Sequence, residues 1–223
     1  MDADERRADV ALANATEEAR QLLRHSHELI VNLTSLDSAS VTLACLSTGA
    51  ELMLKLTIGL SAMRDGKPWP SVSKMQAYGH GIVKMDRECR DGFLADDSTP
   101  PYVKGLVRDM GTDCTLSLLL EAVDHYARAG RFHNLDALSE QPPDPSISPA
   151  ALWEAMEASI WADRPELLAA LKETGQVGES ARAELSAEIA GALHRWWGLY
   201  HQAWAQGLVG GKARQWSTDL RPA

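Results

Sequence analysis

The 223-residue sequence has few cysteines, and none of them forms a Cys-x-x-Cys pair. Cys45, Cys89 and Cys114 are odd in number and widely spaced, and each lies in a helical, largely apolar context. Such thiols argue against a disulfide framework or a zinc knuckle and favour a reducing environment. The N-terminal segment is acidic and polar, without the basic and apolar regions of a secretory signal. We therefore expect a cytoplasmic protein.

Several familiar catalytic motifs are absent as well. The sequence has no glycine-rich phosphate loop after a strand and no Gly-x-Ser-x-Gly elbow. Alternating strand patterns are nearly absent, and no internal repeat of fixed period occurs. These absences predict an all-α protein, an antiparallel helical bundle with a C-terminal helical extension.

Positive charge is in short supply, with 22 Lys and Arg against 31 Asp and Glu and a formal net charge of -9. This balance excludes a general attraction to nucleic acid or anionic membranes, although a local basic site remains compatible with it. The apolar segment 38–63 is long enough to suggest a membrane span, but Glu51 and Lys55 interrupt it. We interpret it as a central buried helix in which these two residues pair, and we expect no membrane contact.

The most informative segment covers residues 101–136. Ser98 and Thr99 can cap a helix that begins with Pro100 and Pro101, and Gly130 is a plausible end. Apolar residues recur at three- and four-residue steps in between, which predicts one helix that buries a broad face. At about 100° per residue, one stripe of this helix carries Ser117, Glu121, Asp124, His125 and Arg128.

This polar stripe has two interpretations. Asp124 and Arg128, four residues apart, would form an ordinary ion pair on a solvated helix face. Alternatively, His125 and His133 would move protons near neutral pH while the Arg128 guanidinium holds a phosphate. The second combination suits phosphodiester chemistry.

Arg128, four intervening residues and His133 match the Arg-x4-6-His pattern of the HEPN superfamily. Its members are small all-helical domains that include metal-independent ribonucleases of toxin and antiphage systems. Upstream, residues 49–55 (GAELMLK) followed by residues 79–85 (GHGIVKM) resemble the helix pair that precedes the motif in many HEPN domains. The resemblance covers roughly residues 15–136. Ala129 departs from active members, which often carry Asn, Asp or His after the arginine.

The resemblance implies an RNA- or nucleotide-associated protein, in its sharpest form a metal-independent ribonuclease. His133 would be the general base or acid at the ribose 2'-hydroxyl and the leaving oxygen, and Arg128 would hold the charge growing on the phosphate. A homodimer would bring two motifs together, and no metal or other cofactor is expected. The candidate catalytic residues are Arg128, His133, His125, Glu121 and Asp124.

Two alternatives stay open. A non-enzymatic interaction module would bind a protein partner through the Trp-rich last helix, expected at about residues 180–207, and it predicts that Arg128 is far from His133 or is paired with Asp124. A metal-dependent bundle would need Glu121, His125 and a histidine from another helix to converge inside. For the aromatic stripe itself, packing of the last helices onto the bundle, or a dimer contact, is favoured over a cofactor site.

Other segments complete the expected organisation. Residues 3–32 predict a helix that Asn14 can divide, and residues 71–90 predict a helix in which His80 lies between two glycines. We favour helix packing over ligand contact for this histidine. Further helices are expected from Ser148 onward. The predicted divisions are a bundle over 1–136, a linker or surface crossing over 137–148, C-terminal helices packing on the bundle over 149–208, and a tail over 209–223.

Overall fold

The computed structural model describes residues 3–33 and 39–222, and all regular structure in these ranges is helical. No β-strand occurs among these residues, which confirms the all-α class. Ser38, the expected start of the second helix, lies outside the described ranges. The α-helices are α1 (Ala3–Val31), α2 (Ala39–Arg64), α3 (Val72–Ala77), α4 (Ile82–Ala95), α5 (Pro101–Thr112), α6 (Cys114–His125), α7 (His133–Asp136), α8 (Pro149–Ile160), α9 (Pro165–Ala170), α10 (Gln176–Ala205) and α11 (Gly211–Trp216). A π-helical turn η2 (Tyr126–Gly130) and 3-10 turns η3 (Pro145–Ile147) and η4 (Ser217–Leu220) complete them.

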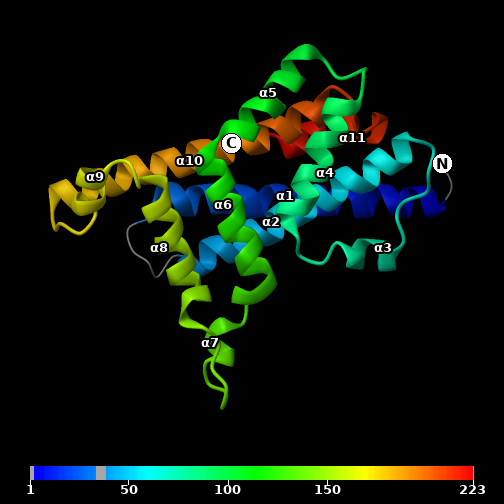
Figure 1. The fold of residues 1–223 in the computed structure, drawn as a ribbon. Coiled ribbons are helices and arrows are strands. Elements are labelled where there is room, and N and C mark those ends of the chain that lie inside the picture. Colours follow the sequence, from blue (N-terminus) through cyan, green and yellow to red (C-terminus); the bar gives the residue numbers. More distant parts are fainter. Residues whose placement is uncertain (1–2, 34–38, 223) are drawn as a thin grey trace.

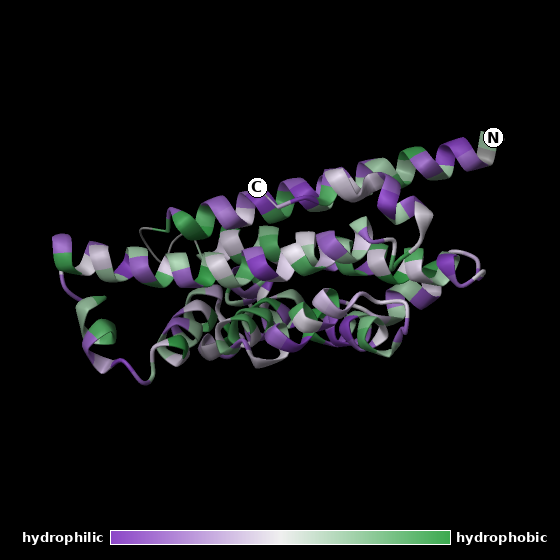
Figure 2. Ribbon diagram, turned by 90° about the horizontal axis from the view of Figure 1, so that it is seen from above, coloured by the Kyte–Doolittle hydropathy of each residue, from purple (hydrophilic) through white to green (hydrophobic). Residues whose placement is uncertain are grey.

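α1 contacts both of the other long helices, α2 and α10, and a shorter pair of helices lies across them. α1 packs antiparallel to α2 and also contacts α10, while α6 and α8 form an antiparallel pair that crosses α2 and α10 (Figure 1). The N-terminal turns of α1 project beyond the other helices and are largely hydrophilic (Figure 2). Residues 209–222, part of the expected tail, are folded, because α11 and η4 pack on α10 and bury Ala213 and Leu220.

The core is dominated by the tryptophans of the C-terminal half. Trp196, Trp197 and Trp204 on α10 are at most 1% exposed, and Trp153 and Trp161 are fully buried as well. They belong to one hydrophobic cluster with apolar residues of α1, α2 and α4. The C-terminal helices therefore share a core with the first bundle, and the indole rings of α10 present no surface to a partner.

The long apolar helix α2 has the length and composition of a membrane span. However, 56% of an apolar 18-residue stretch of this helix is buried inside the chain, and α2 contacts α1, α4 and α8. Core helices of soluble proteins share these properties, so the expectation of no membrane contact stays a prediction.

The helix predicted over residues 101–130 is wrong in one respect, because it divides at Asp113. The Asp113 backbone is extended (φ -77°, ψ 101°), and its side chain accepts a hydrogen bond from the Leu116 amide. Aspartate at this position caps the start of α6 more favourably than it continues α5. The predicted end at Gly130 is confirmed, although the last turn, η2, is π-helical.

The helix predicted over residues 71–90 also divides. α3 ends at Ala77, and α4 begins at Ile82 after a short loop. Gly79 has φ +56°, a backbone conformation that residues other than glycine rarely adopt, and this left-handed residue ends the helical segment. In contrast, Asn14 does not divide α1, and Ser148 caps α8 as expected.

Two carboxylates anchor α8 and the following loop to α10. Glu188 accepts hydrogen bonds from the Thr115 hydroxyl at 2.9 Å, from Trp161 Nε1 at 3.0 Å and from Arg164 Nη2 at 2.6 Å. Burial opposes the ionisation of Glu188, but these hydrogen bonds outweigh it and lower the pKa of the carboxyl. Glu157 accepts from Trp153 Nε1 within α8 at 2.8 Å and from Arg182 Nη1 on α10 at 3.4 Å, and there burial dominates and raises the pKa of the carboxyl.

The two carboxylates should therefore affect acid stability in opposite directions. Glu188, with its lowered pKa, adds stability that is present above its unfolded pKa and is lost as the pH falls through its folded pKa. Glu157, with its raised pKa, loses stability as the pH rises from its unfolded to its folded pKa. Between pH 7 and 3, urea unfolding of Glu188→Gln should show a smaller acid loss than the parent, and Glu157→Gln a larger one. Equal losses in all three proteins would contradict this prediction.

Candidate functional site

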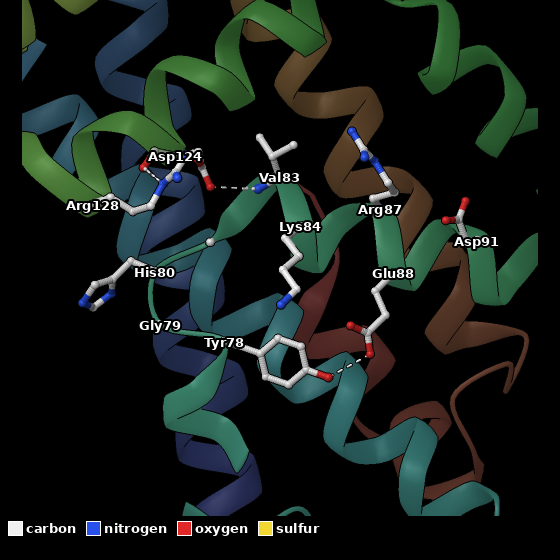
Figure 3. Close-up of a pocket in the computed structure, with 11 residues that line it drawn as sticks. Tyr78, Gly79, His80, Val83, Lys84, Arg87, Glu88, Asp91, Asp124 and Arg128 are labelled. Carbon is white, nitrogen blue, oxygen red and sulfur yellow. Dashed lines mark hydrogen bonds and ion pairs between the residues drawn. The ribbon is translucent and has the colours of Figure 1, made fainter. Parts of the chain in front are cut away.

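A surface groove of about 830 Å³ opens between the start of α4 and the end of α6 (Figure 3). The loop between α3 and α4 forms one wall, the exposed face of α4 forms the floor, and the end of α6 with η2 forms the other wall. The lining residues are Tyr78, Gly79, His80, Gly81, Val83, Lys84, Arg87, Glu88, Asp91, Asp124 and Arg128.

Asp124 joins the two helices that border the groove. Its carboxylate accepts a hydrogen bond from the Val83 amide at 3.1 Å and pairs through its second oxygen with Arg128 Nη2. Gly81, the residue at the N-cap of α4, has no side chain, so Asp124 supplies the missing acceptor from another helix. The pair predicted from the four-residue spacing therefore forms. Asp124 is also buried and accepts the hydrogen bond from the Val83 amide, a contact that the spacing did not predict.

Arg128 keeps most of its side chain in solvent despite this pair. The side chain is 64% exposed, and it lies on the π-helical turn η2 directly after α6. Asp124 can thus hold the guanidinium in place at the rim of the groove while its outer edge stays open to a ligand (Figure 3).

His80 lies at the same end of the groove and is tied to α2. Its Nδ1 is 2.8 Å from Glu51 Oε2, and the other oxygen of Glu51 accepts from Lys55 Nζ at 2.6 Å. The expected pairing of Glu51 with Lys55 is confirmed. The favoured helix-packing role for His80 is wrong in part, because its side chain is 46% exposed and lines the groove.

The remaining polar residues of the groove carry charges of both signs. Lys84 Nζ lies 5.9 Å from the centre of the Tyr78 ring, and neither Lys84 nor Arg87 has a carboxylate partner within the described residues. The Tyr78 hydroxyl donates to Glu88 at 2.8 Å, and burial together with this hydrogen bond raises the pKa of Tyr78 to about 12. Glu88 and Asp91 lie at the end away from His80, and Arg87 lies there with them, so the groove carries cations at both ends (Figure 3).

The groove contains only two of the five candidate catalytic residues. Arg128 and Asp124 line it, whereas His133 is buried at 8% exposure on α7 and its Nδ1 has no hydrogen-bond partner. No hydrogen bond between Arg128 and His133 is found among the described residues. Glu121 is exposed and lines a separate pocket of about 100 Å³. His125 is exposed and lines neither this pocket nor the groove.

A metal site built on Glu121 and His125 is not assembled in the described part of the chain. No cluster there brings together three or more His, Cys, Asp or Glu side chains in positions to hold a metal ion. The three cysteines, all of which lie in the described ranges, are free.

Sequence reasoning missed Tyr78, Lys84 and Arg87 as groove residues. The available signals were the Gly-His-Gly pattern around His80 and the four-residue spacing of Glu51 and Lys55. Nothing local connects Glu51 with His80, because 29 residues separate them and only the packing of the α3–α4 loop on α2 brings them together. No family model, curated protein or solved structure matches this chain.

Proposed function

We propose that the protein associates with RNA or a nucleotide by binding phosphate in the groove between α4 and α6. The observation that carries this proposal is that Lys84, Arg87, Arg128 and His80 all line one groove of an otherwise acidic chain. Phosphate oxygens accept hydrogen bonds from lysine and arginine, and such contacts dominate the affinity of nucleic-acid binding.

The positions of the cations favour a local phosphate site over a general electrostatic attraction to nucleic acid. Lys84 and Arg87 occur three residues apart on α4 and both line the groove, although their side chains leave the helix in different directions (Figure 3). Arg128 approaches from η2, already oriented by Asp124. A net charge of -9 discourages non-specific binding elsewhere on the surface, which favours a local site.

The double change Lys84→Ala and Arg87→Ala tests this function. Fluorescence anisotropy with a labelled single-stranded RNA should show binding by the parent and at least about tenfold weaker binding for each charge-assisted contact removed. The slope of log affinity against log salt should become less steep by roughly 1.4, because two cations no longer displace counterions.

A matched control is available on α5. Lys104 and Arg108 are solvent-accessible cations that do not line the groove, so Lys104→Ala with Arg108→Ala removes the same charge elsewhere. Equal weakening by the two double variants would show that binding depends on net charge alone and would contradict a site in the groove.

A non-enzymatic interaction module is the second candidate, and one observation favours it. That hypothesis predicts an Arg128 paired with Asp124, and the pair is present. Its proposed contact through the tryptophans of α10 would require another surface, since those side chains are buried. A parent protein that binds no RNA or nucleotide in the anisotropy experiment would favour this candidate. The homodimer and the cytoplasmic location remain predictions under either function.

A further inference from the structure

A second pocket opens where the N-terminal half of α1 lies beside the end of α2 (Figure 1). Its volume is about 390 Å³, which is typical of small-molecule sites in proteins. None of its lining residues also lines the groove between α4 and α6. We call it the apolar pocket, and the described residues that line it are Ala8, Asp9, Ala11, Leu12, Ala15, Leu56, Met63, Trp69 and Lys212.

Most of the lining of the apolar pocket is hydrophobic. Leu12 on α1 and Leu56 on α2 are its buried leucines and belong to the core, whereas Met63 and Trp69 are exposed at its rim. A ligand that covers these side chains would gain mainly by removing apolar surface from water. The pocket therefore suits the aliphatic part of a ligand.

Trp69 is held at the rim by its own surroundings. Its indole ring lies over Gly59 on α2, and a Cβ atom at Gly59 would overlap the ring. Pro68 and Pro70 on either side of Trp69 restrict the backbone of this loop. The ring thus forms a wall of a preformed pocket and does not fill it.

One ion pair determines which polar group of a ligand the apolar pocket can accept. Lys212 Nζ on α11 lies 2.5 Å from Asp9 Oδ1 on α1, and both side chains stay partly exposed, at 41% and 29%. They are the only charged residues lining the pocket within the described part of the chain. A carboxylate bound here would be repelled by Asp9, and an ammonium group by Lys212. A hydroxyl group can instead donate to Asp9 and accept from Lys212.

We propose that the apolar pocket binds an uncharged amphiphile, a small aliphatic molecule that carries a hydroxyl group. The aliphatic part lies against Leu12, Leu56 and Trp69, and the hydroxyl group joins the pair of Asp9 and Lys212. This inference is independent of the proposed function, because the two sites share no lining residue.

A series of alcohols tests the aliphatic part. Isothermal titration calorimetry with hexan-1-ol, heptan-1-ol and octan-1-ol should show a Kd that falls about fourfold for each added methylene group. The heat-capacity change of binding should be negative, because apolar surface is buried. An affinity that does not depend on chain length, or no binding of octan-1-ol up to its solubility, would overturn the proposal.

Methionine methyl groups locate the bound alcohol by nuclear magnetic resonance. The methyl signal of Met63, assigned by its loss in Met63→Leu, should shift when octan-1-ol is added to protein with isotope-labelled methionine. Met110 and Met156 are buried elsewhere and should keep their signals. An unchanged Met63 signal at saturating alcohol would rule out this site.

Octanoate and octylamine test the ion pair, because they have as many carbon atoms as octan-1-ol and differ in charge. Both should bind the parent at least about tenfold more weakly than octan-1-ol. Asp9→Asn leaves Lys212 unopposed, so the affinity for octanoate should rise relative to the alcohol. Lys212→Met leaves Asp9 unopposed and should favour octylamine in the same way. A parent that prefers octanoate or octylamine would contradict an uncharged ligand.

Ala11→Leu blocks the apolar pocket with little expected effect on the core. Ala11 is exposed and lines the pocket, so the larger side chain occupies the space of the ligand and should weaken octan-1-ol binding by about tenfold. Ala187 on α10 is also exposed but lies outside the pocket, and Ala187→Leu is the matched control that should bind like the parent. Equal affinities of the two variants would exclude binding in this pocket.

Flotation with phosphatidylcholine vesicles distinguishes a soluble amphiphile from a lipid in a membrane. The parent should not float with the vesicles, because exposed charged residues precede the pocket on α1 and would have to be desolvated at a membrane; they are Glu5, Arg6 and Arg7. Flotation of the parent that Ala11→Leu abolishes would assign the pocket to a membrane surface and overturn the proposal of a soluble ligand.

Discussion

Asp86→Ala is expected to lower the free energy of unfolding by about 3–5 kcal/mol. Asp86 is fully buried on α4, and its oxygens accept from Trp196 Nε1 at 2.7 Å, from the Tyr200 hydroxyl at 2.8 Å and from Arg90 Nη2 at 2.6 Å. Alanine would remove the carboxylate acceptor of these three donors, one of them charged, and the Tyr200 hydroxyl would keep only the backbone carbonyl of residue 86, at 3.4 Å. Breaking a buried pair from one side is costly because the remaining charge is desolvated and uncompensated.

The hydrogen bonds of Asp86 also join α4 to α10, and α4 forms the floor of the groove. Burial and the charge of Asp86 raise the pKa of Tyr200 well above its usual value, which keeps the hydroxyl protonated as a donor. Loss of Asp86 should loosen the helix that carries Lys84 and Arg87, and RNA affinity should fall together with stability.

Urea unfolding and thermal melting followed by circular dichroism measure the effect. For a chain of this length the melting temperature should fall by about 10 °C. Asp86→Asn, which keeps one acceptor oxygen, should lose less. Asp91→Ala removes an exposed acid from the same helix and should change stability by less than about 0.5 kcal/mol. An Asp86→Ala protein as stable as Asp91→Ala would show that the network contributes no net stability.

Trp204→Ala should be destabilising to a similar extent, by about 3–5 kcal/mol. Trp204 is fully buried on α10, and its Nε1 donates to the Thr57 hydroxyl on α2 at 3.0 Å. The Thr57 hydroxyl in turn donates a hydrogen bond to the Met53 carbonyl at 2.8 Å. The truncation would therefore leave a cavity between two of the longest helices and remove the hydrogen bond that joins them.

Trp69 offers a control of the same residue type. Its ring lies over Gly59 on α2 but is 43% exposed, so Trp69→Ala should cost no more than about half as much. A double-mutant cycle of Trp204→Phe with Thr57→Val isolates the hydrogen bond, which we expect to contribute about 1 kcal/mol. Equal losses for Trp69→Ala and Trp204→Ala would contradict the assignment of Trp204 to the core.

Local patterns in the sequence predicted the long elements well. Apolar periodicity located α1, a long apolar segment located α2, and Ser148 before Pro149 marked the start of α8. Periodicity failed at Asp113 and Gly79, where the apolar pattern continues but the backbone does not. At such positions the preference of one residue for a cap or a left-handed conformation outweighs the helix propensity of the residues around it.

For the candidate site, sequence reasoning identified Arg128 and its partner Asp124 but not the groove. The motif joined Arg128 to His133 through spacing alone, and the chain after η2 instead carries His133 into a buried position on α7. The histidine that shares the groove with Arg128 is His80, which comes from a loop almost fifty residues earlier in the sequence.

The sequence by itself determined the all-α class, the main helices and the four-residue ion pairs Glu51–Lys55 and Asp124–Arg128. These follow from interactions within one or two helical turns, where spacing alone fixes which side chains meet. Only the tertiary structure decided that Glu51 holds His80 and that Asp124 also caps α4. Contacts between helices depend on how the helices cross and which faces they bury, and no pattern within one segment encodes that geometry.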